Sequence, residues 1–79
     1  MEFNAITKSI FEIIDMEPIP VNKTTSLKEE LDVDSLQMVN LMTRLAETFD
    51  VPFARFIEHA DLIDTMGGIY QIITGEVKS

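Results

Sequence analysis

The chain has 79 residues, 46% hydrophobic and 25% charged, and its 14 acidic against 6 basic side chains give a net charge of −8. This length has room for one domain, and we expect it to span residues 1–79. The negative charge disfavours nucleic acid and anionic membranes as partners and suits proteins with basic patches.

The composition argues against disulfides and metal sites. The chain has no cysteine, which excludes disulfides and thiolate metal sites, and its single histidine, His59, argues against a zinc centre. No apolar run approaches the roughly 18 residues of a membrane span. The first residues also lack the pattern of a signal peptide. We therefore expect a cytoplasmic monomer.

Helical segments can be predicted in chain order. Apolar residues at helical spacing predict a helix over residues 3–16. A long connection with prolines follows, and inside it Ser26 and Glu29 have the spacing of a capping box, which predicts one helical turn ending near Leu31. The clearest helix runs over residues 35–49 and stops before Pro52.

The last third of the chain predicts two more helical pieces. "FARFIEH" favours a short helix, and we expect Phe53, Phe56 and Ile57 in the core and Arg55 in solvent. A final helix runs from Met66 to Ile73 and is stopped by Gly75. Two glycines in its first turn, 67 and 68, favour either close packing or a weak helix start, and the sequence does not decide between them.

These elements predict an all-α fold. No strand-like alternation of useful length occurs, so we expect a small antiparallel four-helix bundle, with three main helices, one short helix and a long first loop. The expected core consists of Ile6, Ile10, Met38, Leu45, Phe49, Ile69 and Ile73.

The start of the second long helix has unusual chemistry. Asp34 occupies the N-cap position, and Gln37 lies three residues later, where it completes a capping box. Ser35 then lies at the helix N-terminus, where free N–H groups and the helix dipole favour a phosphate ester on its hydroxyl. The plain alternative is that these residues only cap the helix.

Two apolar residues of the same helix lie off its core-facing stripe. Leu36 and Val39 fall beside polar residues, which suggests a contact surface next to Ser35. Single exposed apolar side chains are common, however, so this pattern alone is weak.

The segment "LDVDSLQMVNLMTRLAETFDV" resembles the acyl carrier protein family. The likeness extends over nearly the whole chain, through the apolar first helix, the long loop, the S-x-x-E turn and the apolar last helix. It implies a carrier rather than an enzyme. Ser35 would bear 4′-phosphopantetheine from coenzyme A, and the thiol of this arm would hold acyl groups as thioesters for fatty-acid, polyketide or related synthesis.

The resemblance also implies partners and contact residues. A phosphopantetheinyl transferase would attach the arm, with Asp34 as both cap and contact for the transferase or its Mg²⁺. Acyl-loading, condensing or acyltransferase enzymes with basic docking patches would follow. Their contacts would be Leu36, Val39, Glu29, Glu30, Asp32 and Glu47.

Some positions depart from the family pattern. The outward face of the second long helix is nearly neutral where fatty-acid carriers are acidic, and Thr43 replaces a larger apolar residue. Asp32 stands where many relatives have glycine. These departures favour a dedicated pathway over housekeeping fatty-acid synthesis.

Other functions remain open or are excluded. An aminoacyl or peptidyl carrier would use a serine at the same place, and an unmodified helical interaction domain could keep the fold. An EF-hand beginning at Asp32 is excluded, because Gln37 stands where its loop needs glycine. No nucleophile–base pair or metal cluster is visible, so we expect no intrinsic catalysis.

Overall fold

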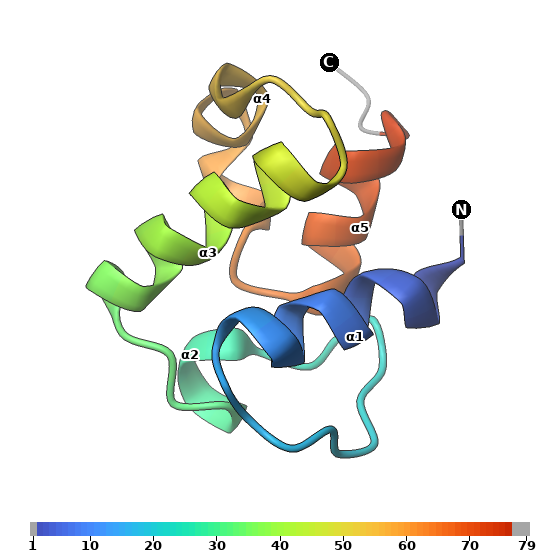
Figure 1. Cartoon of the computed structure of the whole chain (residues 1–79), viewed down its shortest axis with the longest axis vertical. Helices are drawn as coiled ribbons and strands as arrows, with labels where there is room; N and C mark the ends of the chain where they lie inside the picture. The colour runs from blue at the N-terminus through green and yellow to red at the C-terminus, as the bar shows by residue number, and fades with distance from the viewer. Residues whose placement is uncertain (1, 77–79) are drawn as a thin grey trace.

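The computed structural model describes residues 2–76, and this part of the chain is helical without a β-strand. The elements are α1 (Phe3–Ile13), α2 (Leu27–Glu30), α3 (Ser35–Thr48), α4 (Phe53–Glu58), η1 (Ala60–Leu62, a 3₁₀ turn) and α5 (Met66–Thr74). Helix α1 packs against α3 and α5, and α4 packs against α3 (Figure 1). The prediction of a small all-α bundle with a long first loop is confirmed.

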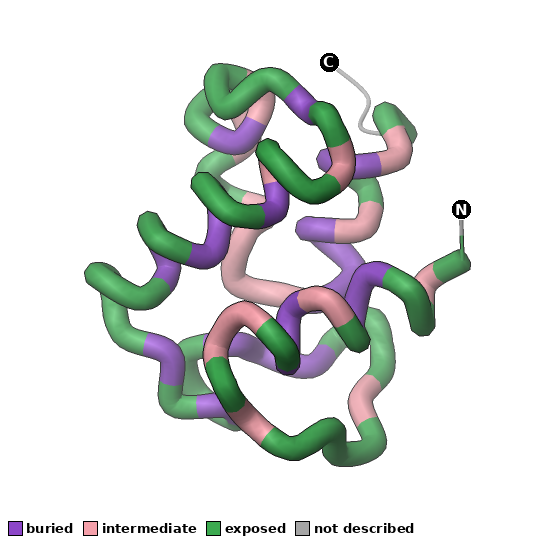
Figure 2. The backbone as a smooth tube through the Cα atoms, in the orientation of Figure 1, coloured by how far each residue is buried: buried purple, intermediate pink, exposed green. Residues whose placement is uncertain are grey.

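The core lies where α1, α3 and α5 meet, and buried positions face inward on all three helices (Figure 2). The predicted core is confirmed except for Phe49, which is only partly buried because it forms the C-cap of α3. Full burial of one such apolar side chain is worth about 1.5–3 kcal/mol. The buried members predicted from the sequence are Ile6, Ile10, Met38, Leu45, Ile69 and Ile73.

Helix α1 is shorter than predicted, because it ends in a left-handed residue. Asp15 has φ 57°, and the N–H of Met16 bonds to the carbonyl of Phe11 at 3.0 Å. Helix α3 ends in the same way, with φ 54° at Asp50. Glycine usually takes this position, but aspartate tolerates the conformation better than most other residues.

Helix α4 departs from the prediction that its apolar residues are core. Phe56 is fully buried, but Phe53 and Ile57 are exposed because they lie on the outer face of the helix. Arg55 is half-buried rather than solvated, and its guanidinium donates to the carbonyl oxygen of Ile72 at 3.4 Å. Only one of the three apolar side chains therefore anchors α4 to the core.

The long loop and α2 are tied to the start of α5. The N–H of Leu27 donates to the carbonyl of Asp64 at 2.7 Å, and the N–H of Met66 donates to the carbonyl of Thr25 at 3.1 Å. The Ser26 hydroxyl donates to the Asp64 carboxylate at 3.1 Å. These bonds hold α2, and with it the segment that leads into α3, against the bundle.

The capping box predicted at Ser26 forms with a different partner. The Ser26 hydroxyl accepts from the N–H of Glu29 at 3.1 Å, as predicted. The reciprocal bond comes from the next residue, because the Ser26 N–H donates to Glu30 Oε2 at 2.7 Å. Two reciprocal hydrogen bonds therefore cap the N-terminus of the short helix.

Candidate functional site

The turn from α2 into α3 fixes where Ser35 lies. Leu31 and Val33 are both buried, and the Val33 N–H donates to the carbonyl of Leu27 at 3.0 Å. Between them Asp32 is exposed, with φ 57°. This left-handed conformation suits glycine best, and aspartate tolerates it better than most other residues.

The predicted capping box at the start of α3 is confirmed. The Gln37 N–H donates to Asp34 Oδ1 at 2.8 Å, and the Asp34 N–H donates back to Gln37 Oε1 at 3.2 Å. Ser35 is therefore the first residue of a 14-residue helix, and its side chain is exposed. The backbone that carries its hydroxyl is held by hydrogen bonds on both sides of the residue.

This geometry fits a phosphate ester on Ser35. The hydroxyl is open to solvent at the positive end of α3, where a dianionic or monoanionic group is stabilised by the helix dipole. One oxygen of the Asp34 carboxylate is engaged with the Gln37 N–H, so the cap reduces the repulsion that a free carboxylate would exert on a neighbouring phosphate.

Leu36 and Val39 lie where the helical pattern predicted. They are 80% and 51% exposed, whereas Met38 on the opposite face is buried. The polar residues beside them are also exposed: Gln37, Asn40, Thr43, Arg44 and Glu47. The outward face of α3 is thus confirmed as a mixed apolar and polar surface, and its role in binding partners remains a prediction.

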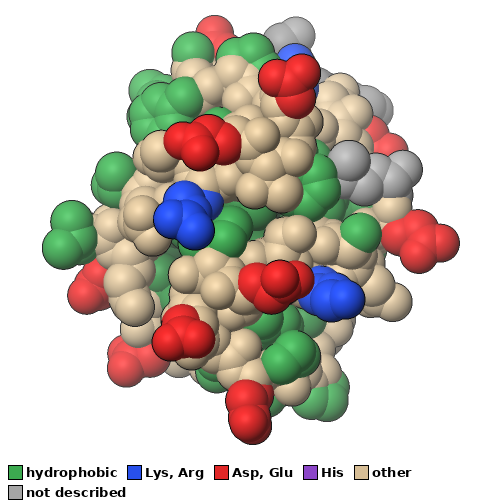
Figure 3. Space-filling view, in the orientation of Figure 1, with side chains coloured by type: hydrophobic (Ala, Val, Ile, Leu, Met, Phe, Trp, Pro, Cys, Tyr) green, Lys and Arg blue, Asp and Glu red, His purple; other side chains and the backbone are tan. Residues whose placement is uncertain are grey.

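The acidic residues that were predicted as partner contacts divide into two groups. Glu29, Glu30, Asp32 and Asp34, here called the serine-end acids, are all exposed; the first two end α2, and the other two lie in the turn that leads to Ser35. Figure 3 shows Asp and Glu side chains at several separate places on one face of the molecule. Glu47 is exposed on the last turn of α3, so the structure does not bring it to this group.

Sequence reasoning missed two features of the structure. Asp64 supports α2 from a distant part of the chain, since its carboxylate also accepts from the Lys28 N–H at 3.3 Å. No local pattern could have shown this long-range bond. Phe53 and Ile57 add exposed apolar surface on α4, and their i, i+4 spacing was the available signal that they share one face.

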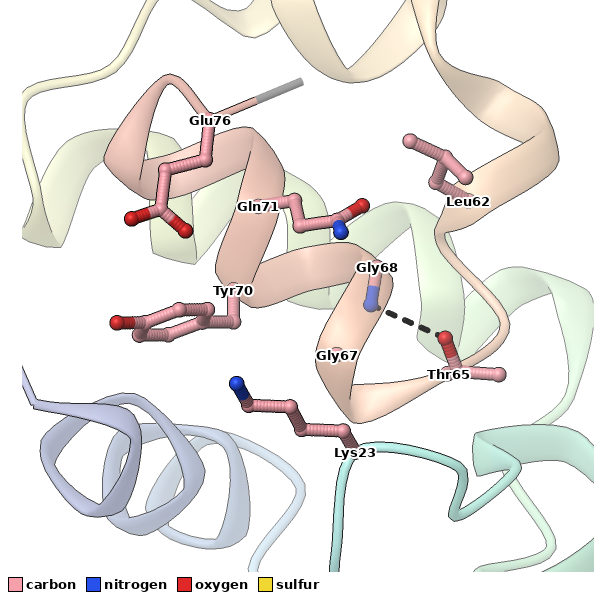
Figure 4. Close-up of a pocket in the computed structure, with 8 residues that line it drawn as sticks. All are labelled: Lys23, Leu62, Thr65, Gly67, Gly68, Tyr70, Gln71 and Glu76. Atoms are coloured by element: carbon pink, nitrogen blue, oxygen red, sulfur yellow. Dashed lines mark hydrogen bonds between the residues drawn. The ribbon is translucent and has the colours of Figure 1, made fainter. Parts of the chain in front are cut away.

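A separate pocket is lined by the two adjacent glycines, Gly67 and Gly68 (Figure 4). The Lys23 ammonium lies 5.3 Å from the centre of the Tyr70 ring, and the Thr65 hydroxyl caps α5 by accepting from the Gly68 N–H at 3.0 Å. None of the predicted site residues lines this pocket.

The bundle presents an exposed serine on the capped first residue of α3, a place that suits a covalently attached phosphate ester. Residues 4–66 match the family described as "Phosphopantetheine attachment site". The chain belongs to this family, whose members carry covalently attached 4′-phosphopantetheine. No solved structure matches the chain significantly.

Within residues 2–76, every helix is too short or too polar to cross a membrane.

Proposed function

We propose that residues 1–79 form a single acyl carrier domain whose phosphopantetheine arm is attached to Ser35. The exposed hydroxyl on the capped first residue of α3 carries this assignment, together with the match to the phosphopantetheine attachment site family. The terminal thiol of the bound arm supplies the thioester chemistry. Ser35 provides the ester oxygen, and the Asp34–Gln37 cap holds the backbone that carries it.

The residues around Ser35 have separate roles in this proposal. The serine-end acids attract the basic patch of a phosphopantetheinyl transferase, and Asp34 also contacts the transferase or its Mg²⁺. Leu36 and Val39 are partner contacts, because they are exposed beside the attachment site and contribute little to the core. Glu47 adds one further charge at the end of α3.

The pathway is a dedicated one. Glu47 is the only carboxylate on the outward face of α3, and Arg44 lies three residues before it on the same helix. Housekeeping fatty-acid enzymes that read an acidic helix therefore gain little attraction here. Acyl groups are loaded and removed by enzymes of a fatty-acid, polyketide or related secondary pathway, with the carrier acting as a monomer in the cytoplasm.

Intact-mass measurement tests the attachment site. The apo-protein is incubated with coenzyme A, Mg²⁺ and a promiscuous transferase. Wild type should gain the mass of one arm, and Ser35→Ala should gain none. Thr43→Ala removes another exposed hydroxyl from the same helix and should gain one arm. An arm on Ser35→Ala, or no arm on wild type with several transferases, would overturn the proposal.

A further inference from the structure

Helix α2 is too short to be stable by itself and depends on the groups that meet its N-terminus. It consists of one turn, Leu27–Glu30, and isolated helices shorter than about 12 residues are marginal in water. Only its first side chain, that of Leu27, is buried. The N–H groups of a first helical turn have no partner within the helix, so the groups that accept from them decide whether the turn forms.

Asp64, which is distant in the sequence, supplies most of these acceptors. The N–H of Leu27 donates to its backbone carbonyl at 2.7 Å, and the N–H of Lys28 donates to its carboxylate Oδ1 at 3.3 Å. The third N–H, that of Glu29, donates to Ser26 Oγ at 3.1 Å. The Ser26 hydroxyl donates its single proton to the Asp64 carboxylate, whose oxygens lie 3.1 and 3.2 Å away. The carboxylate therefore also orients the hydroxyl that caps α2.

The residues after α2 pass this support on to the serine at the start of α3. The carbonyl of Leu27 accepts from the N–H of Val33 at 3.0 Å, and Leu31 and Val33 are both buried. Asp34 follows directly and caps α3, so Ser35 lies only two residues beyond the bond to Leu27. A series of hydrogen bonds thus connects the segment before α5 with the start of α3.

We propose that Asp64 is a positioning residue for attachment of the arm: it keeps α2 formed and thereby holds Ser35 where a transferase can reach it. This inference rests on the proposed attachment at Ser35. Asp64 acts through α2 and not on the reacting atoms. The role requires a hydrogen-bond acceptor at this place rather than a negative charge, because the groups that Asp64 meets on α2 are neutral donors.

Loss of the Asp64 carboxylate should change binding of the transferase more than the chemical step. Without it, α2 opens in a larger fraction of molecules that are otherwise folded. A transferase that binds the closed form then has an apparent affinity lowered by the fraction that is closed, which raises KM. In the complex α2 is closed and Ser35 is in place, so kcat should stay the same. A loss of global stability does not raise KM while nearly all molecules remain folded.

Three variants separate these effects. Asp64→Ala removes both side-chain acceptors. Asp64→Asn keeps one oxygen, and Oδ1 alone lies 3.2 Å from the Ser26 hydroxyl and 3.3 Å from the Lys28 N–H. Thr65→Ala is the matched control, because it removes a cap from the adjacent residue. The Thr65 hydroxyl accepts from the Gly68 N–H at 3.0 Å and so caps α5 rather than α2 (Figure 4).

Two measurements are made on the full-length apo-protein. Intact mass follows the rate of arm attachment against carrier concentration, with saturating coenzyme A, Mg²⁺ and a promiscuous transferase. Amide hydrogen exchange of Val33, whose N–H joins the turn to α2, reports the opening of α2 without any transferase. Circular dichroism and urea unfolding check that each variant is folded. If Asp64→Ala does not fold, Ser26→Ala replaces it with the same expected results, because it removes the hydroxyl between Asp64 and the Glu29 N–H.

Asp64→Ala should raise KM by about 3- to 10-fold, the size expected for loss of one helix cap, and leave kcat unchanged. Exchange of the Val33 amide should become faster by a similar factor. Asp64→Asn and Thr65→Ala should both stay within about twofold of wild type in KM and in Val33 exchange.

Four results would each overturn the inference: an unchanged KM in Asp64→Ala, unchanged Val33 exchange in that variant, an equal rise of KM in Thr65→Ala, or an equal rise in Asp64→Asn. The last result would mean that the transferase reads the charge of Asp64 directly. Absence of an arm on wild type would refute the attachment itself. An arm on wild type together with an unaffected Asp64→Ala would refute only the positioning role.

Discussion

The carbonyl oxygen of Leu62 occupies the space where a side chain on Gly68 would begin, so a Cβ built there would overlap it. Gly67 is similarly confined. A Cβ built on it would lie 2.8 Å from the Cβ of Lys23 and 2.8 Å from the carbonyl oxygen of Lys23. The glycine pair therefore allows η1 and the long loop to approach the first turn of α5. Of the two readings that the sequence left open, close packing is the one that the geometry supports.

Gly68→Ala should therefore lower the free energy of unfolding by about 1–3 kcal/mol, because the backbone around Leu62 must move. A weak helix start would give the opposite sign, since alanine favours a helix by about 1 kcal/mol relative to glycine. Urea unfolding decides between the two. Gly75→Ala is a useful comparison, because its nearest neighbour is 3.9 Å away and its loss should come from the left-handed φ of 76° alone.

Asp34→Asn should separate the cap from the charge. Asparagine caps a helix about as well as aspartate, so the free energy of unfolding should change by less than about 0.5 kcal/mol. Arm attachment should slow if the carboxylate contacts the transferase or its Mg²⁺. Asp34→Ala, which also loses the cap, should cost about 1 kcal/mol of stability. Attachment to Asp34→Asn at the wild-type rate would leave Asp34 with the capping role alone.

Leu36→Ala and Val39→Ala should each change the unfolding free energy by less than about 1 kcal/mol while slowing arm attachment or acyl loading. Leu45→Ala should cost about 2–5 kcal/mol, because Leu45 is fully buried in the same helix. Chemical denaturation and loading rates are measured on the same preparations. Comparable destabilisation at all three positions would contradict the assignment of Leu36 and Val39 to partner binding.

Charge on the outward face of α3 should control which enzymes accept the proposed acyl carrier. One acyl group is loaded on this protein and on an ordinary fatty-acid carrier, and both are assayed with the same housekeeping condensing enzyme. We expect a lower kcat/KM for this protein and a partial recovery with Gln37→Asp combined with Asn40→Glu, which adds two carboxylates to the exposed face. Equal kcat/KM for the two wild-type carriers would remove the case for a dedicated pathway.

The sequence predicted the start of α3 well because the signals there are local. A capping box needs only Asp34 and Gln37 at the right spacing, and the exposed position of Leu36 follows from helical periodicity. Both were confirmed. The same local logic chose the wrong partner in α2, where Glu30 rather than Glu29 bonds to the Ser26 N–H, because both residues are within reach of the cap.

Features that depend on distant residues could not be predicted in the same way. Phe53 and Ile57 are apolar, but α4 is six residues long and Phe56 takes the one fully buried position among its aromatic and aliphatic side chains. The support of α2 by Asp64 joins residues 38 apart in the chain. Hydrophobicity shows that a side chain can be buried, and only the packing of neighbouring helices shows whether space for it exists.

The hydrogen bonds around Ser35 have a consequence for delivery of the cargo. With the cap on one side and the turn through Asp32 on the other, the proposed attachment point is a fixed pivot, and the arm itself provides the reach. A docked enzyme then meets a thioester confined to a small volume, at an effective concentration of the order of millimolar whatever the amount of carrier in bulk solution. Under these conditions transfer depends on how long the two proteins stay together, so a short-lived complex favours the enzyme whose chemistry is fastest.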